Sequence, residues 1–160
     1  MYEVRIATPK DVIGIRDVAT KAWYNTYLDI YAASTVNELL AASYNESHLL
    51  KRLETQLFLV AVEEDEVVGF ANFISGTELY LSAHYVRPHS QCKGFGRLLL
   101  EKGLAHFQDQ YDAVYLEVDM QNKRGVAFYE REGFEITRTY DRDMYEETMH
   151  LALMKKPLTT

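Results

Sequence analysis

A strand, a glycine turn, a helix and a second strand follow one another in the middle of this 160-residue chain, and they constrain the fold more than any other feature. Residues 78–86 alternate as a β-strand does, residues 94–108 repeat apolar side chains at helical spacing, and residues 113–118 form a second apolar strand. Two strands of one sheet that are joined by a helix run parallel, with a right-handed connection. The sequence therefore predicts a parallel strand pair with a helix packed across it.

The two faces of the strand at residues 78–86 differ in character. Period-two alternation divides its side chains into two sets. The set expected to face the core is Leu79, Leu81, Ala83 and Tyr85. The set expected on the other face, where it can line a cleft, is Glu78, Tyr80, Ser82 and His84.

The remaining elements surround this unit. Further strands are expected at residues 2–6, 57–62, 67–74, 134–140 and 148–154, and further helices at residues 34–43, 45–53 and 122–132. The first helix is expected to begin with Thr8 as its N-cap and Pro9 in its first turn, and its apolar positions run to Trp23. This order predicts a mixed, mostly antiparallel α/β sheet with helices on both faces, in a single domain of residues 1–160.

Charge and composition exclude several classes of partner. The chain has 17 Lys and Arg against 24 Asp and Glu, a net charge of -7, whereas nucleic-acid binders are basic or carry a basic face. The longest apolar run, residues 57–62, is far shorter than the roughly 20 residues of a membrane span, and the first residues do not resemble a signal peptide. The single cysteine, Cys92, cannot form a disulfide within the chain, and the histidines follow no metal-ligand spacing. We expect a cytoplasmic protein that binds no nucleic acid, no membrane and no metal.

The turn before the central helix has the properties of a phosphate-binding site. Two glycines in residues 94–96 let the backbone approach a ligand, and the first N–H groups of a helix lack partners within it. Arg87, Lys93 and Arg97 add positive charge to an otherwise acidic chain. The segment has neither the Gly-Lys-Ser/Thr of nucleotide hydrolases nor the third glycine of dinucleotide-binding proteins. A purely structural entry into the helix is the alternative.

Three motifs in this order resemble the GNAT family of N-acetyltransferases. Gln91-Cys92-Lys93-Gly94-Phe95-Gly96 matches the family's Gln/Arg-x-x-Gly-x-Gly/Ala motif, at the required place between a strand and a helix. Residues 116–118, Asn122 and residues 127–135 then follow the order of the family's second strand–helix–strand unit. The resemblance covers about residues 57–140, and the closing residues 145–154 are similar to those of the Pai-type bacterial polyamine acetyltransferases.

The resemblance implies a site for acetyl-CoA, as co-substrate, between two splayed parallel strands at residues 79–86 and 113–118. Backbone N–H groups of residues 93–97 would bind the pyrophosphate, and Tyr85 and Val86 would pair with the pantetheine amides. Asn122 would hydrogen-bond the pantetheine arm, and an N-cap of the following helix is the alternative role of this side chain. The residues expected to contact the co-substrate are Tyr85, Val86, Gln91, Cys92, Lys93, Gly94, Phe95, Gly96, Arg97, Asn122 and Tyr129.

Tyr129 matches the general acid of the family. When an amine attacks a thioester, the leaving thiolate has a conjugate acid with a pKa of about 8.5, and a phenol with a pKa of about 10 can share or donate a proton as the charge develops. The alternative is an ordinary core aromatic residue beside Val126. The motif around Tyr129 favours catalysis.

The general base is left open by the sequence. An amine with a pKa of about 10.4 is mostly protonated at pH 7, which adds about 4.6 kcal/mol to the barrier for attack. The candidates for a base or an acceptor contact on the two central strands are Glu78, Tyr80, His84 and Glu117. The family's acid on the first of these strands aligns nearest to Tyr80, and His84 has the alternative role of a buried, hydrogen-bonded core residue.

Aromatic side chains at Trp23, Tyr24, Tyr27 and Tyr31 lie in the region that shapes the acceptor pocket in this family. Because aromatic faces and an acidic surface attract cations, we expect transfer of an acetyl group to the primary amine of a small cationic acceptor such as a polyamine, by direct attack in a ternary complex. A protein N-terminus or lysine as acceptor, and a catalytically silent acyl-CoA-binding regulator, are the alternatives. A homodimer with residues 140–145 in its interface is a further expectation, and an irregular hairpin between the last strands is the alternative for this segment.

Overall fold

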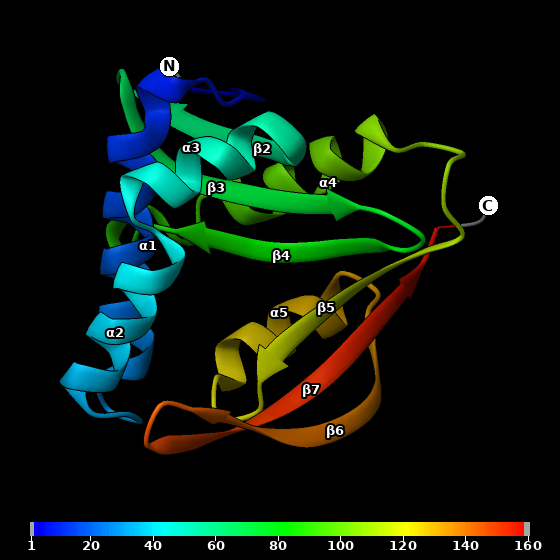
Figure 1. Cartoon of the computed structure of the whole chain (residues 1–160). Helices are drawn as coiled ribbons and strands as arrows, with labels where there is room; N and C mark the ends of the chain where they lie inside the picture. Colours follow the sequence, from blue (N-terminus) through cyan, green and yellow to red (C-terminus); the bar gives the residue numbers. More distant parts are fainter. Residues whose placement is uncertain (1, 159–160) are drawn as a thin grey trace.

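A computed structural model describes residues 2–158 of the chain. Seven strands form one sheet in the order β1-β2-β3-β4-β5-β7-β6 (Figure 1). They are β1 Tyr2–Ile6, β2 Leu57–Glu63, β3 Glu66–Ser75, β4 Leu79–Val86, β5 Ala113–Asp119, β6 Glu135–Met144 and β7 Glu147–Pro157. Among these neighbours β4 and β5 are parallel and every other pair is antiparallel, which confirms the predicted mixed sheet.

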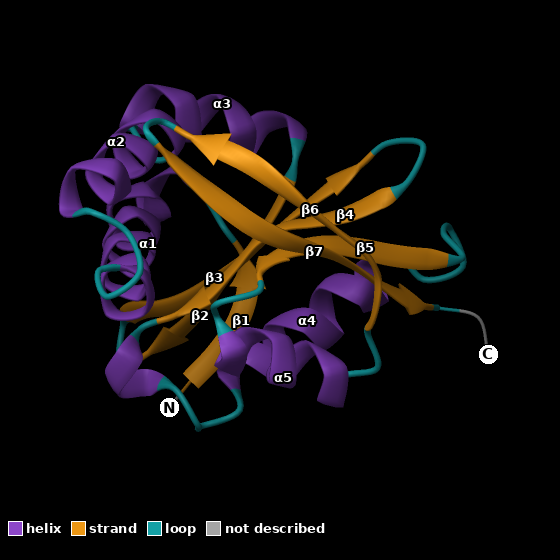
Figure 2. Ribbon diagram, turned by 90° about the horizontal axis from the view of Figure 1, so that it is seen from below, coloured by secondary structure: helices purple, strands orange, loops and turns teal. Residues whose placement is uncertain are grey.

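Helices cover both faces of the sheet, as predicted. They are α1 Val12–Tyr27, α2 Ala33–Ser43, α3 Glu46–Thr55, α4 Phe95–His106 and α5 Lys123–Arg131. The first three helices lie on one side and α4 and α5 on the other (Figure 2). No helix among residues 2–158 has both the length and the apolar character that a membrane crossing requires.

The start of α1 lies one turn later than the sequence predicts. Thr8 and Pro9 lead into a 3₁₀ turn, Pro9–Asp11, and the α-helix begins at Val12. The buried Asp11 carboxylate accepts hydrogen bonds from the Thr8 N–H at 2.8 Å and from the Arg5 guanidinium at 2.8 and 3.0 Å. This pairing compensates the buried charge and ties β1 to the helix that follows.

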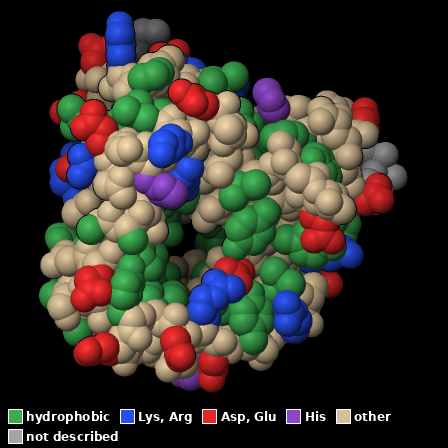
Figure 3. All heavy atoms as spheres, in the orientation of Figure 1, with side chains coloured by type: hydrophobic (Ala, Val, Ile, Leu, Met, Phe, Trp, Pro, Cys, Tyr) green, Lys and Arg blue, Asp and Glu red, His purple; other side chains and the backbone are tan. Residues whose placement is uncertain are grey.

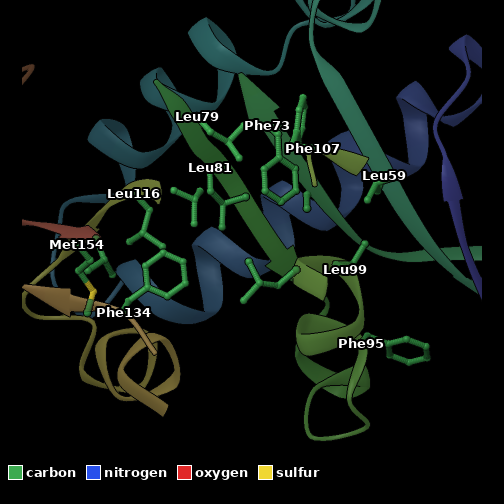
Figure 4. Packing of buried hydrophobic residues seen from close by; sticks show 14 of the residues in the cluster. Leu59, Phe73, Leu79, Leu81, Phe95, Leu99, Phe107, Leu116, Phe134 and Met154 are labelled. Atoms are coloured by element: carbon green, nitrogen blue, oxygen red, sulfur yellow. The ribbon is translucent and has the colours of Figure 1, made fainter. Parts of the chain in front are cut away.

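Two hydrophobic clusters form the core, one on each face of the sheet. The cluster under α4 contains Phe73 of β3, Leu99 of α4 and Leu116 of β5 (Figure 4). The cluster on the opposite face packs α1, α2 and α3 around Phe58 and Phe70. These clusters hold the two layers of helices against the two faces of the sheet.

A β-bulge in β4 changes the predicted assignment of its faces. Asn72 of β3 pairs with Ala83, but the next residue, Phe73, pairs with Leu81, so Ser82 is the extra residue. Leu79 and Leu81 therefore pack under α4, whereas Ala83 belongs to the cluster under α1. The expectation that Leu79, Leu81, Ala83 and Tyr85 share one face is wrong beyond Ser82, because the bulge shifts the alternation by one residue.

The parallel strands β4 and β5 pair over only two residues. Leu79 pairs with Val114 and Tyr80 with Tyr115, and the ladder then ends. Beyond Tyr80, β4 remains paired with β3, and β5 remains paired with β7. The two strands diverge from this point, as expected for a splayed pair, and each is left with one backbone edge that has no strand beside it.

Residues 140–145 belong to the closing hairpin. β6 ends at Met144 and β7 begins at Glu147, and both strands are longer than predicted. Tyr145, in the turn between them, has a φ of 59°. Met144 is buried against the helical layer of α1 and α2. The hairpin accounts for this segment, and a homodimer stays a prediction.

Candidate active site

A cleft of about 1220 Å³ opens where β4 and β5 diverge. Residues of β4, β5, α1, α3, α4 and α5 line its walls. The space-filling view shows the molecule hollowed at this place (Figure 3). Ligand pockets typically measure about 300–1,000 Å³, so this cleft is large enough for an extended ligand together with a second, small one.

The first turn of α4 presents backbone donors to the cleft. Gly94 has a φ of 88°, a left-handed conformation that favours glycine, and open space surrounds the position of a Cβ there. Phe95 anchors the turn because its side chain is buried in the core. The first helical bond runs from the Leu98 N–H to the Gly94 carbonyl at 3.0 Å, so the N–H groups before Leu98 have no partner within the helix. This geometry is that of an anion site.

The side chains of the turn contribute less than its backbone. The Gln91 amide lines the cleft and donates to the Val86 carbonyl at 3.2 Å, which fixes the exit from β4. Cys92 also lines the cleft and is exposed, with a φ of 65°. Lys93 and Arg97 pair with nearby glutamates at 3.4 and 3.0 Å, and the Lys93 side chain lies outside the cleft lining.

Tyr129 of α5 reaches the cleft and is joined to the start of α4 through His84. The Tyr129 hydroxyl lies 3.0 Å from His84 Nδ1, and His84 Nε2 lies 2.7 Å from the Gly96 carbonyl oxygen. The bulge at Ser82 turns His84 toward α4 and α5, away from the face of Tyr80 to which the alternation had assigned it. Sequence reasoning thus identified both residues but not their contact.

Burial changes the proton affinities of this pair in opposite directions. Burial lowers the pKa of His84 from 6.5 to about 4, against the opposing effect of its bond to the Gly96 carbonyl. Burial also raises the pKa of the Tyr129 phenol far above its usual value, with a further contribution from Tyr85. At neutral pH the imidazole is uncharged and the phenol is protonated, so His84 is a weak base.

Asn122 has the cap role that the sequence left open, and its side chain also lines the cleft. It is the N-cap of α5, where its Oδ1 accepts from the Gly125 N–H at 3.0 Å. Its Nδ2 lies 3.5 Å from the Tyr27 hydroxyl across the cleft, and both residues line the cleft. The cap holds the amide in place and leaves it accessible to a ligand.

Glu117 is an acceptor for three side chains. It receives two hydrogen bonds from Arg142, at 2.8 and 2.6 Å, one from Tyr80 at 3.1 Å and one from Tyr140. Burial alone would raise the pKa of Glu117, but these bonds outweigh it and hold the pKa below the usual value. The carboxylate stays ionised and its oxygens already accept hydrogen bonds from protein donors, so it is a poor base. Arg142 was missed by sequence reasoning, because no local pattern joins β6 to β5 across β7.

Two of the candidates for a base or an acceptor contact, Glu78 and Tyr24, are not brought to the cleft. Glu78 is exposed ahead of β4 and outside the cleft lining, because the cleft opens only beyond Tyr80, at the other end of the strand. Tyr24 is 39% exposed on α1 and donates to Asn37 of α2 at 2.5 Å. Tyr24 directly follows the buried Trp23 in α1, so its side chain projects from a different side of the helix and points away from the sheet.

Aromatic and cationic side chains form the opposite wall of the cleft. Trp23 and Tyr27 line it with ring centroids 4.3 Å apart, whereas Tyr31 is buried behind them and donates to Asp119. Arg52 of α3, which the sequence did not indicate, also lines the cleft and donates to the Ser43 carbonyl and to Asn72 at 2.7 and 2.8 Å. Within residues 2–158 no group of three or more His, Cys, Asp or Glu is placed to hold a metal ion.

Comparison with known sequences places these features in a family. The sequence profile of the acetyltransferase (GNAT) family matches residues 18–134. Spermidine N(1)-acetyltransferase of Thermoplasma acidophilum is 27% identical over 153 residues, which are 91% of this chain and 95% of that protein. Mycothiol acetyltransferase of Streptomyces coelicolor is 36% identical over 95 residues, 57% of this chain and 30% of that one. The peptidyl-lysine N-acetyltransferase YiaC of Escherichia coli is 28% identical over 74 residues, 46% of this chain and 47% of that one.

Solved structures share the fold over the whole length. PaiA N-acetyltransferase of Thermoplasma acidophilum, in complex with coenzyme A, superposes with a TM-score of 0.85 at 24% identity, covering 98% of this chain and 99% of that one. The ribosomal-protein-S18-alanine N-acetyltransferase of Escherichia coli superposes with a TM-score of 0.76 at 18% identity, covering 100% of this chain and 96% of that one. A profile match that spans the diverging strands, the glycine turn and Tyr129 shows that this chain belongs to the acetyltransferase (GNAT) family and is an N-acetyltransferase.

Proposed function

We propose that the protein transfers an acetyl group from acetyl-CoA to the primary amine of a small acceptor, by direct attack in a ternary complex. The observation that carries this proposal is the divergence of β4 and β5 beside the first turn of α4, with Tyr129 facing the opening. The free strand edges offer amide pairing for an extended pantetheine arm. The N–H groups of residues 93–97 offer donors for its pyrophosphate, and Asn122 offers an amide beside the arm.

Tyr129 is proposed to stabilise the leaving sulfur. The neutral amine nitrogen forms a bond to the acetyl carbon, the carbon–sulfur bond breaks, and its electron pair stays on sulfur while the nitrogen's surplus proton goes to solvent. Because burial raises the pKa of Tyr129 well above that of a thiol, the phenol keeps its proton and shares it with the sulfur in a hydrogen bond. Such a donor in a partly dry site strengthens as the negative charge develops.

A polyamine is the acceptor that we propose first. The relative that aligns over 91% of this chain is a spermidine N(1)-acetyltransferase. Of the described cleft-lining residues only Glu117 and Asp119 carry carboxylates, and both already accept hydrogen bonds from protein donors. The rings of Trp23 and Tyr27 would therefore receive the cationic amine through their faces.

A lysine side chain of a protein is the second candidate. Several relatives are peptidyl-lysine N-acetyltransferases, YiaC of Escherichia coli among them, and they align over about half of this chain. A lysine acceptor presents the same primary amine to the same cleft. A peptide must also thread its backbone past the rim, which a polyamine need not do.

Release of free thiol from acetyl-CoA tests these proposals directly. Spermidine, spermine, an uncharged amine and lysine and N-terminal peptides would be offered to the wild type and to Tyr129→Phe. We expect turnover on the polyamines and a loss of about 100-fold in kcat in the variant. Tyr111→Phe is the matched control, because that hydroxyl donates to the Gly76 carbonyl at 2.8 Å, outside the cleft lining.

The other outcomes separate the alternatives. Turnover on peptides alone would replace the polyamine with a protein acceptor. Absence of turnover on every acceptor, with acetyl-CoA still raising the melting temperature, would favour a silent acyl-CoA-binding regulator. Equal kcat in wild type and Tyr129→Phe would contradict the role given to Tyr129.

A further inference from the structure

We infer that His84 is a positioning residue, which joins the Tyr129 hydroxyl to the first turn of α4 and so sets both the orientation of the phenol and its alignment with the bound acetyl-CoA. This inference rests on the role proposed for Tyr129. It is carried by two hydrogen bonds, 3.0 Å from His84 Nδ1 to the Tyr129 hydroxyl and 2.7 Å from His84 Nε2 to the Gly96 carbonyl.

The partners of His84 determine which of its nitrogens carries the proton. The Gly96 carbonyl oxygen can only accept, so Nε2 must carry a hydrogen and donate it. The second nitrogen, Nδ1, then has a lone pair in the neutral ring, and the Tyr129 hydroxyl is the donor to it. The two bonds therefore run in one direction, from the phenol through the imidazole to the backbone of α4.

Packing leaves the imidazole little freedom. The ring lies against Phe128 with centroids 5.7 Å apart and against Tyr129 with centroids 5.8 Å apart. A Cβ placed on Gly96 would lie 3.9 Å from His84 Cε1. The three elements β4, α4 and α5 meet at this ring, which is there because the bulge at Ser82 turns it away from the opposite face.

This arrangement has a consequence for the reaction. In the resting state the hydroxyl of Tyr129 donates to a neutral nitrogen. As sulfur becomes negative, the hydroxyl proton makes a second, charge-assisted contact with it, in a three-centre bond that keeps the contact with Nδ1. His84 neither gains nor loses a proton in this step. Its task is to hold the phenol oxygen at the correct distance from the turn that binds the pyrophosphate, where small displacements reduce rate strongly.

Two substitutions separate the two bonds. Glutamine at position 84 can place an amide N–H near the position of Nε2 but offers Tyr129 no acceptor at the position of Nδ1. Asparagine can place an oxygen near the position of Nδ1 but cannot reach the Gly96 carbonyl. We expect His84→Gln to lower kcat about tenfold with an acetyl-CoA KM within about twofold of wild type. We expect His84→Asn to retain most of kcat and to raise the acetyl-CoA KM.

Removal of the Tyr129 hydroxyl supplies the decisive control. In a Tyr129→Phe background, His84→Gln should cause no further loss of kcat, because the bond it removes is already absent. An equal tenfold loss in both backgrounds would overturn the inference, and so would an unchanged kcat in the single variant. An unchanged kcat in Tyr129→Phe alone would contradict the role proposed for Tyr129. A lack of turnover on every amine would instead contradict the proposed function itself.

A measurement on the wild-type protein does not depend on the folding of any variant. Nitrogen-15 spectra of labelled histidine distinguish a protonated Nε2 from a protonated Nδ1, and the His84 signal is identified by its change in Tyr129→Phe. We expect the neutral form with the proton on Nε2. A proton on Nδ1 would reverse the direction of the bond to Tyr129 and overturn the inference.

Discussion

Asn122 caps a helix and also lines the cleft. Its Oδ1 caps α5 while its Nδ2 faces the Tyr27 hydroxyl. We expect Asn122→Ala to lower the free energy of unfolding by about 1 kcal/mol, because one N–H at the helix start loses its acceptor. We also expect a several-fold higher KM for acetyl-CoA, measured by thiol release.

Asn45 provides the matched cap for this comparison. It caps α3 by accepting from the His48 N–H at 2.9 Å, and it lies outside the cleft lining. Asn45→Ala should lose a similar free energy of unfolding in urea titrations and keep the acetyl-CoA KM. The same KM in both alanine variants would mean that Asn122 is a cap and nothing more.

Glu117 can be tested as a base through the pH dependence of the rate. Hydrogen bonds from Arg142 and Tyr80 help to hold its pKa below the usual value despite burial, so it is ionised throughout pH 6–9. The pH at which kcat/KM falls on the acidic side should therefore be the same in Glu117→Gln as in the wild type, even where the maximum value of kcat/KM differs. Displacement of that pH by a full unit would identify Glu117 as the base.

At the scale of elements, the seating of α4 on the sheet depends on Gly103. A Cβ there would lie 2.0 Å from Phe73 Cε1, in a fully buried contact. We expect Gly103→Ala to lower the free energy of unfolding by about 1–3 kcal/mol, because overpacking outweighs the roughly 1 kcal/mol that alanine adds to helix propensity. Thermal and urea unfolding measure this difference.

Gly76 supplies a contrasting alanine substitution in a turn. A Cβ at Gly76 meets only the Glu78 carbonyl, at 4.0 Å. Gly76→Ala should change the free energy of unfolding by less than about 0.5 kcal/mol, the usual range for surface substitutions. A loss at Gly103 no larger than this would show that the helix shifts to accommodate the methyl group.

At the scale of the whole molecule, His84 couples folding to pH. Its pKa is about 4 in the folded state, and the unperturbed value is 6.5, because burial disfavours the charged ring. Between these values the unfolded chain binds a proton that the folded chain does not. The contribution of His84 is therefore intact above pH 6.5 and falls by up to about 3 kcal/mol as the pH drops toward 4.

The histidine-specific part of this loss is measurable. Urea unfolding at pH 7 and pH 4.5 would be compared for the wild type and His84→Asn. Asp11 and Glu117, whose pKa values are also lowered, contribute to both proteins and cancel in the difference. We expect the wild type to lose more stability than the variant over this range. Equal losses would mean that His84 is protonated in the folded protein at pH 4.5.

Local patterns in the sequence were sufficient for much of this architecture. The seven strands, their order along the chain and the glycine turn before α4 follow from periodicity and from residues with strong backbone preferences. The parallel pairing of β4 and β5 follows from the helix that joins them. The strands and the glycine turn depend on neighbours within a few residues, and the pairing of β4 with β5 follows from a general rule of chain connection, so a single sequence suffices to predict them.

The contacts that assemble the site were decided by the tertiary structure. The bulge at Ser82 depends on how β4 meets β3, and it alone turns His84 toward Tyr129, 45 residues away. The pairing of Glu117 with Arg142 likewise depends on a hairpin packing beside β5. Register and burial arise between segments distant in sequence. Most of the candidate side chains are therefore visible in the sequence, whereas Arg52 and Arg142, and the protonation and partners of the candidates, are set by the folded chain.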